Sequence, residues 1–163
     1  MDFHPIVVHF PIALLVIYAI LECIVLRSLL VRPWWTPLKR FLVLVGTVGL
    51  VASQVTGRMA GAEAVADGDP VTLWHQFFAN ISTAVFAFLA ACYLLSLPAF
   101  LETEGRIPWL AVPRRLTSHP ALLIPLALLG LAALILTGGF GGLMVHGTGK
   151  DPFMDWMYGI LVS

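Results

Sequence analysis

The sequence predicts an all-α integral membrane protein: a bundle of four transmembrane helices followed by a short segment at the membrane interface. Of its 163 residues, 60% are hydrophobic and only 11% are charged, whereas about a quarter of the residues of a soluble domain are charged. The mean hydropathy is +0.94. Several apolar runs also reach the ~20 residues that a helix needs to cross ~30 Å of hydrocarbon.

We expect four spans, at about residues 5–30, 38–61, 71–97 and 118–144, which together form one transmembrane domain over residues 1–150. Pro5 suits the first turn of a helix, where its missing N–H is not needed, and Pro11 should kink the first span. In the second span, small residues recur every four positions and should let another helix approach closely. These residues are Gly49, Ser53, Gly57 and Gly61.

The third span carries a stripe of small residues headed by a histidine: His75, Ala79, Thr83, Ala87 and Ala91. The fourth span is rich in Leu and Ala until it changes into TGGFGGLMVHGTG. Residues 151–163 are too short to span a membrane. We expect them to lie at the interface as an amphipathic tail anchored by Trp156 and Tyr158.

The positive charges predict the orientation of the spans, because Lys and Arg gather in cytoplasmic loops. The first connection holds Arg27, Arg32, Lys39 and Arg40, and the third holds Arg106, Arg114 and Arg115. The opposite side holds Arg58 and Lys150. Both termini should therefore face the outside, which is the periplasm if the protein lies in the inner membrane of a bacterium. The N-terminus lacks a basic region and an A-x-A cleavage site, so we expect the first run to be a retained helix.

Several classes of function find no support in the sequence. The net charge is zero and no basic tract points to nucleic acid. No nucleophile motif, phosphate-binding loop or pair of acids within a span indicates an enzyme. Cys23 and Cys92 lie in apolar runs and are expected to be small core residues without a disulfide. Glu22, the carboxylate within a span, is expected to pair with Arg27 or to snorkel, and a proton relay is the alternative.

Four histidines fall at one level of the predicted topology, on its outer side: His4, His9, His75 and His146. His119 lies on the cytoplasmic side and is interpreted as a helix cap. Any single histidine of the four is explained as an interfacial anchor or a cap, and His4 beside Pro5 fits a cap well. Their common level on three different spans instead favours a shared ligand, and ionisable groups at membrane depth usually mark functional sites.

A haem b held by axial histidines from two helices is the cofactor that fits this pattern best. Gly138 and Gly142 precede His146 by eight and four residues and would leave a flat slot, although helix contact alone also explains them. Arg58 is placed to bind the propionates. Two axial histidines suit electron transfer rather than oxygen chemistry. We expect one haem, or two if the four histidines form two pairs, with His9 the deeper and better ligand of the first pair.

Two alternatives remain open. A copper ion is suited to His and Met ligands, and His146 lies close to Met144, with Met59 at a similar level. A cofactor-free accessory subunit of a respiratory or photosynthetic complex would account for the small size and for the tail.

Three patches resemble a bacterial family of four-helix membrane proteins known as domain of unknown function 2231. They are HPIVVHFPIALL at residues 4–15, His75 followed by Asn80, and GGLMVHGTG at residues 141–149. Met144 departs from the family pattern, and the tail from Pro152 onward has no counterpart in it.

The resemblance implies four membrane helices and a polar core made of His4, His9, His75, Asn80 and His146. It also implies partners among cytochromes or other redox proteins. Together with the haem interpretation, this leads us to expect a quinol and a periplasmic cytochrome, or a larger membrane redox complex, as partners.

Overall fold

The fold is helical throughout the part of the chain that the structure describes. The computed structural model describes residues 4–97, 111–117 and 119–162, and the side chains of these ranges except those of residues 4–7, 60, 111 and 114. Helices make up 86% of the structure, and the described ranges hold no strand. The helices are α1 (His4–Cys23), α2 (Arg27–Leu30), α3 (Trp35–Ala60), α4 (Ala62–Ala66), α5 (Pro70–Leu95), α7 (Ala111–Thr117), α8 (Pro120–His146) and α9 (Pro152–Leu161). The prediction of an all-α fold is confirmed.

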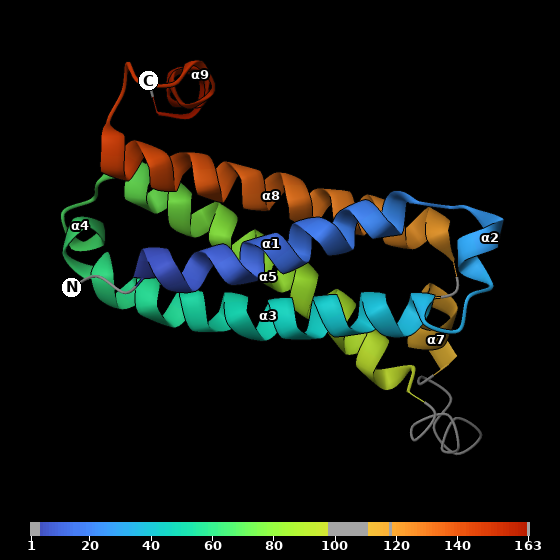
Figure 1. Cartoon of the computed structure of the whole chain (residues 1–163). Coiled ribbons are helices and arrows are strands. Elements are labelled where there is room, and N and C mark those ends of the chain that lie inside the picture. The colour runs from blue at the N-terminus through green and yellow to red at the C-terminus, as the bar shows by residue number, and fades with distance from the viewer. Residues whose placement is uncertain (1–3, 98–110, 118, 163) are drawn as a thin grey trace.

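The long helices α1, α3, α5 and α8 form an elongated bundle in which neighbours along the chain run in opposite directions (Figure 1). Contacts run from α1 to α3, from α3 to α5, from α5 to α8 and from α8 back to α1. The start of α1, the end of α8, α4 and α9 lie at one end, which we call the α4 end. Helices α2 and α7 lie at the other, which we call the α2 end.

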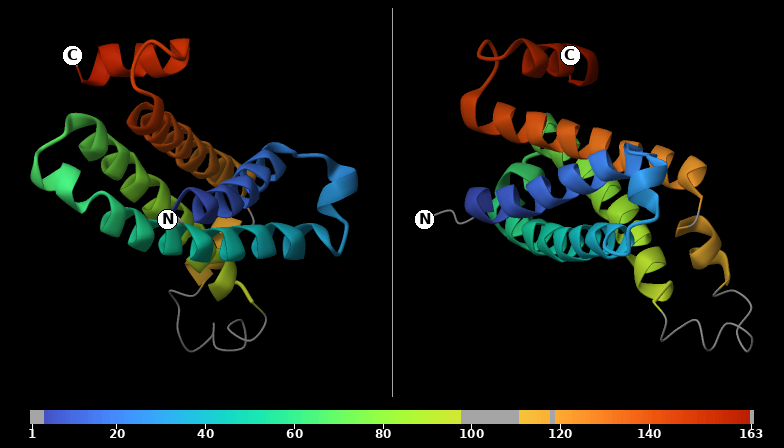
Figure 2. Two further views of the ribbon diagram at one scale, coloured as in Figure 1. Left: turned by 60° about the vertical axis from the view of Figure 1, so that its left-hand side comes forward. Right: turned by 45° about the vertical axis from the view of Figure 1, so that its right-hand side comes forward.

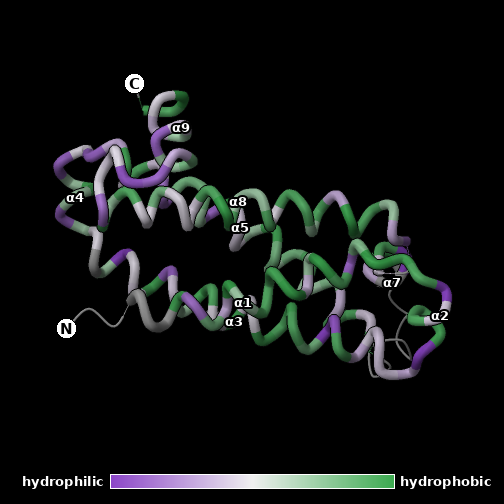
Figure 3. The backbone as a smooth tube through the Cα atoms, turned by 45° about the horizontal axis from the view of Figure 1, so that its top comes forward, coloured by the Kyte–Doolittle hydropathy of each residue, from purple (hydrophilic) through white to green (hydrophobic). Residues whose placement is uncertain are grey.

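The middle of the bundle is apolar and its two ends carry the polar segments, as a membrane protein requires (Figure 3). Within the described ranges, three helices are long and apolar enough to cross a membrane: Trp35–Met59, Pro70–Leu95 and Pro120–His146. The described part of the first helix, Val8–Cys23, is apolar but shorter. A membrane-spanning helical protein is therefore supported.

The helix ends correct the expected spans by a few residues, and the first span by more. The expected span over residues 5–30 ends at Cys23, because the chain leaves the helix before α2 and Leu26 is extended at φ −91° and ψ 122°. Pro70 and Pro120 open α5 and α8. Proline is favoured at the first helical position, where no N–H is needed and its fixed φ is already helical.

Helices α1 and α3 pack closely where proline meets glycine. Pro11 is fully buried inside α1, which continues as one helix on both sides of it. A Cβ atom on Gly49 would lie 2.9 Å from the Cβ of Pro11, too close for an unadjusted contact. The expected close approach at the stripe of small residues is confirmed at this position.

The apolar core divides into two clusters. The larger takes side chains from all four long helices, among them Leu15, Val43, Phe86 and Ala127, and fills the half of the bundle toward the α2 end. The smaller joins α5, α8 and α9 around Phe140 at the α4 end. None of the described side chains of α1 and α3 belongs to that smaller cluster. The pair α1/α3 accordingly separates from the pair α5/α8 toward the α4 end (Figures 2 and 3).

A buried ion pair joins α1 and α3 near the α2 end and corrects the expected partner of Glu22. Its Oε2 accepts a hydrogen bond of 2.8 Å from Lys39 Nζ, and its Oε1 accepts one from the hydroxyl of Tyr93 on α5. Glu22 does not snorkel, since only 1% of its side chain is exposed. Arg27 is exposed on α2, beyond the break in the helix, whereas Lys39 lies one turn into α3 and faces α1.

The tail forms α9, which lies crosswise to the bundle beside the end of α8 (Figure 2). Gly147 and Gly149 of the HGTG motif, where the chain turns, have φ values of +70° and +79°. Glycine is favoured at such positions because it has no Cβ atom. Asp151 then caps α9 by accepting hydrogen bonds from the amides of the second and third following residues. Trp156 is 60% exposed, and its role as an interfacial anchor stays a prediction.

Candidate functional site

The histidines lie toward the ends of the bundle, and those whose side chains are described differ in exposure and in hydrogen bonding. The backbone of His4 opens α1, and its side chain lies outside the described part. His9 and His146 are exposed, and His75 is partly buried. His119 lies at the α2 end in the N-cap position of α8, but its ring does not cap that helix. Its Nδ1 lies 2.6 Å from the carbonyl oxygen of Arg115 on α7 instead.

His75 is the most constrained of these side chains. Its Nδ1 lies 2.9 Å from the carbonyl oxygen of Thr137 on α8. Because a carbonyl oxygen only accepts, we assign the proton to Nδ1, which makes Nε2 the acceptor nitrogen of the neutral ring. Metal-binding histidines commonly have this arrangement, in which one ring nitrogen donates to a carbonyl and the other binds the metal.

Helical periodicity places His75 on the face of α5 that builds the core. Ser82, Phe86, Leu89 and Tyr93 follow it at intervals that return to the same face, and all four are buried. His75 therefore continues the core stripe of α5 into the α4 end.

Gln54 of α3 also continues a core stripe, whereas His9 of α1 and Gly138 of α8 are exposed. His9 shares a face of α1 with Ile12 and Val16, which pack against the larger cluster. Gln54 follows Leu50 by one turn on α3. Gly138 follows Leu134 by one turn on α8.

We group His9, Gln54, His75 and Gly138 as the candidate site. His75 and Gln54 place polar groups on the core faces of α5 and α3 toward the α4 end, and His9 and Gly138 are exposed on α1 and α8. A Cβ atom on Gly138 would meet no atom within 4 Å.

Gly142 does not belong to this site, which corrects the expected slot beside His146. A Cβ atom there would clash with the end of the Met154 side chain, whose Sδ would lie 2.9 Å away. Gly139 makes room for Met157 of α9 in the same way. These glycines allow the tail to dock against α8, and the flat surface expected near His146 is covered by methionine.

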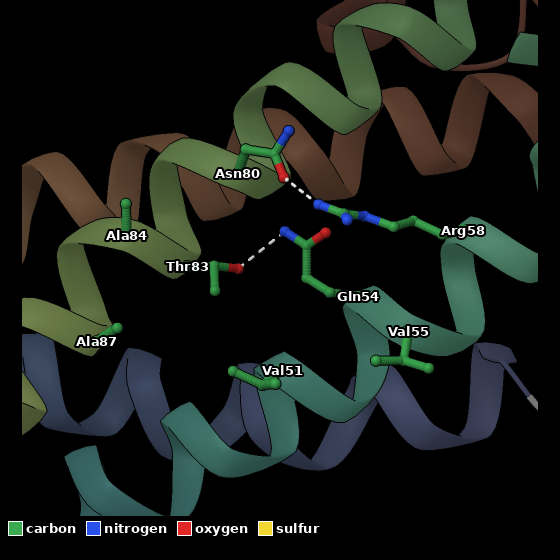
Figure 4. Close-up of a pocket in the computed structure, with 8 residues that line it drawn as sticks. All are labelled: Val51, Gln54, Val55, Arg58, Asn80, Thr83, Ala84 and Ala87. Carbon is green, nitrogen blue, oxygen red and sulfur yellow. Dashed lines mark hydrogen bonds between the residues drawn. The ribbon is translucent and has the colours of Figure 1, made fainter.

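A groove between α3 and α5 borders the site (Figure 4). Its volume is about 360 Å³, and apart from four polar side chains its walls are Val and Ala. The polar side chains form two hydrogen bonds across the helices. Arg58 Nη2 donates to Asn80 Oδ1 at 3.3 Å, and Gln54 Nε2 donates to Thr83 Oγ1 at 2.9 Å.

The sequence predicted Arg58 and Asn80 as site residues, and the structure brings these two together. It missed Gln54 and Thr83 as members of the same polar row. The signal was present in the spacing, since Gln54 precedes Arg58 by four residues and Asn80 precedes Thr83 by three, so each pair lies on one face of its helix. Which face of α3 meets which face of α5 is a property of the packing.

A metal ion bound directly by several side chains finds little support in the described residues. Among them, no three His, Cys, Asp or Glu side chains are grouped closely enough to hold one. Met144 and His146, expected as a copper pair, are two residues apart in one helix and do not face each other. Met59 is 78% exposed on α3.

Comparison of the chain with models of protein families, with curated proteins and with solved structures finds no match. The resemblance to the family of unknown function 2231 therefore stays a prediction, and the function is argued from the site alone.

Proposed function

We propose that the protein is a b-type cytochrome of a bacterial inner membrane, which binds haem at the α4 end and transfers electrons on the periplasmic side. The observation that carries this proposal is the fixed orientation of His75. A neutral imidazole whose Nδ1 donates to the Thr137 carbonyl has Nε2 as its acceptor nitrogen, and this is the atom that we propose as the iron ligand.

The surroundings of His75 fit a large flat cofactor. The Cε1 atom of its ring lies 3.5 Å from the Cβ position of Gly141, so α8 brings no side chain between the ring and the backbone there. Gly138 adds open space one turn earlier on α8. We propose His9 of α1 as the second ligand, because it is exposed and lies toward the same end of the bundle on another helix. His146, at the exposed end of α8, and His4 are the residues for a second haem.

Arg58 and Asn80 are proposed to bind the propionates. The guanidinium carries five N–H groups, and the bond to Asn80 uses one of them. This bond holds the Arg58 side chain along the groove between α3 and α5. A carboxylate there would gain charge-assisted hydrogen bonds, which are stronger than neutral ones.

The proposed activity follows from the ligand set. Haem with two axial histidines has no open coordination site and supplies one-electron transfer. The orientation rests on the positive-inside rule, since Lys39 and Arg40 lie near the α2 end and Arg58 near the α4 end. Electrons would pass from a membrane quinol to a periplasmic cytochrome, or within a larger redox complex.

The test is the absorption spectrum of the full chain, purified from cells that are supplied with a haem precursor. We expect a Soret band that shifts on reduction, and we expect His75→Ala to abolish it. His119→Ala is the matched control, because that histidine also bonds a helix carbonyl through Nδ1 but lies at the α2 end. His9→Ala should change the spin state or remove the haem.

The absence of a Soret band in the wild-type chain, or an unchanged band in His75→Ala, would overturn the proposal. If haem is absent, elemental analysis for copper tests the metal alternative. Co-purification in mild detergent tests the accessory subunit.

A further inference from the structure

A second polar site lies at the α2 end, where the haem proposal assigns no function. A pocket of about 280 Å³ opens between the end of α1, the loop around α2 and the starts of α3 and α8. Its polar wall contains Glu22, Lys39 and Thr117, and its apolar wall contains Val25 and Leu30 among other residues. A buried ion pair that lines a pocket near the end of a membrane helix indicates a functional site.

The ion pair restricts what the pocket can bind. Glu22 and Lys39 lie 2.8 Å apart and have side chains that are 1% and 10% exposed. Their charges balance, so a charged head group would add an uncompensated charge in a medium of low dielectric constant. A neutral ligand avoids this cost. It can still use both signs of the pair, because the carboxylate accepts hydrogen bonds and the ammonium donates them.

Trp35 adds a flat wall and a donor without a partner. Lys39 Nζ lies 6.0 Å from the centre of its ring. The side chain lines the pocket and is 3% exposed, and its indole N–H has no hydrogen-bond partner in the described part of the chain. Buried donors of this kind are rare, because leaving one unsatisfied costs about 1–3 kcal/mol. A carbonyl oxygen of a ligand would satisfy it.

We propose that this pocket binds the head group of a membrane quinone. A quinone ring is flat and neutral, its carbonyl oxygens accept hydrogen bonds, and in the quinol form its hydroxyls donate them. Lys39 and the indole of Trp35 are the donors to the carbonyls, and Glu22 is the acceptor for a quinol hydroxyl. The apolar wall formed by Val25 and Leu30, which are 49% and 41% exposed, leads outward for the tail.

The experiment uses the fluorescence of Trp35 in the full chain, reconstituted without haem into phospholipid nanodiscs. In the reporter chain, the other four tryptophans (Trp34, Trp74, Trp109 and Trp156) are replaced by Phe. The probe is decylubiquinone, a benzoquinone with a short tail. We expect saturable quenching of Trp35. A second reporter that keeps only Trp74, at the α4 end, should show the linear, non-saturating quenching of quinone dissolved in lipid.

The double variant Glu22→Gln/Lys39→Met removes both charges and leaves none unpaired. We expect it to bind decylubiquinone at least about tenfold more weakly, as the loss of one hydrogen bond to a charged group predicts. The matched control is Glu63→Gln/Lys150→Met, which removes an exposed acid and an exposed base outside the pocket. It should bind as the unaltered reporter does.

Identical quenching curves for the two reporters, or unchanged binding in Glu22→Gln/Lys39→Met, would overturn the proposal. Displacement of the probe by palmitate at equal concentration would also overturn it, since it would show a site for an anionic lipid. The inference does not rest on the haem proposal: His75→Ala should keep quinone binding even when it loses the Soret band. If the reporter chains fail to fold, binding is measured in chains that keep all of their tryptophans, as the rise in unfolding temperature that decylubiquinone causes. The same charge variants are compared in this assay.

Discussion

The buried pair of Glu22 and Lys39 allows a prediction whose size follows from the structure. At 2.8 Å and an effective dielectric constant of about 20, their attraction is about 6 kcal/mol before desolvation is counted. Removing one partner leaves the other charge buried and unpaired, which costs ~3–5 kcal/mol in comparable pairs. We therefore expect Lys39→Met and Glu22→Gln each to lower the free energy of unfolding by about this amount.

The double variant should be far less destabilised than the sum of the two single variants. Two neutral side chains of similar volume avoid desolvation, and such replacements are often neutral or stabilising. The assay is a double-mutant cycle measured by denaturant unfolding in detergent micelles, with far-ultraviolet circular dichroism as the signal. Arg27→Gln, which removes the partner expected from the sequence, should change stability by less than about 0.5 kcal/mol. Single-variant effects below about 1 kcal/mol that simply add in the double variant would refute this reasoning.

Three further predictions concern other parts of the bundle. Asp69, the N-cap of α5, accepts hydrogen bonds from the hydroxyl and the amide of Thr72, and these lower the pKa of its carboxyl group below the ordinary 3.8. The stability that the ionised cap contributes is therefore present above pH 3.8 and is lost as the pH falls through the lowered pKa. Asp69→Asn should keep the cap and flatten the acid limb of stability measured against pH. Gly49→Ala should destabilise by about 1–3 kcal/mol because it overpacks Pro11, whereas Gly138→Ala should stabilise the haem-free chain by about 0.5–1 kcal/mol, both measured by thermal unfolding. Gly139→Val should release α9 and speed its proteolysis while leaving the unfolding of the four long helices unchanged.

The long helices were predictable because apolar runs bounded by proline and glycine have a direct physical meaning. Pro70 and Pro120 each lie within two residues of an expected start. The break after Cys23 was not predictable, since the residues that follow it are as apolar as those before. The chain leaves the helix there because the connection to α3 has to turn, which is a property of the packing.

The sequence predicted toward which end of the bundle the candidate-site residues lie, but not which way their side chains point. The topology placed the histidines at one level, and the structure keeps His9, His75 and His146 at the α4 end. Which face of each helix meets another depends on rotation about its own axis, which a sequence of uniformly apolar residues leaves undetermined. For that reason Gly142, assigned to a cofactor slot, packs against α9 instead. For the same reason the expected pairing of Glu22 with Arg27 was wrong, although Glu22 does pair with a cation, Lys39.

The polar residues on the core faces of α3 and α5 are the strongest argument that the α4 end has a function beyond stability. A chain selected only to fold would continue these two stripes with apolar or small side chains, whose close packing drives helix association in a membrane. Gln54 and His75 interrupt the apolar core on their helices toward the α4 end, while all four long helices supply apolar core residues toward the α2 end. One polar position is ordinary in a membrane bundle. Two on different helices toward the same end, one bonded to Thr83 and the other to the Thr137 carbonyl, are the expected cost of a site that must admit a ligand.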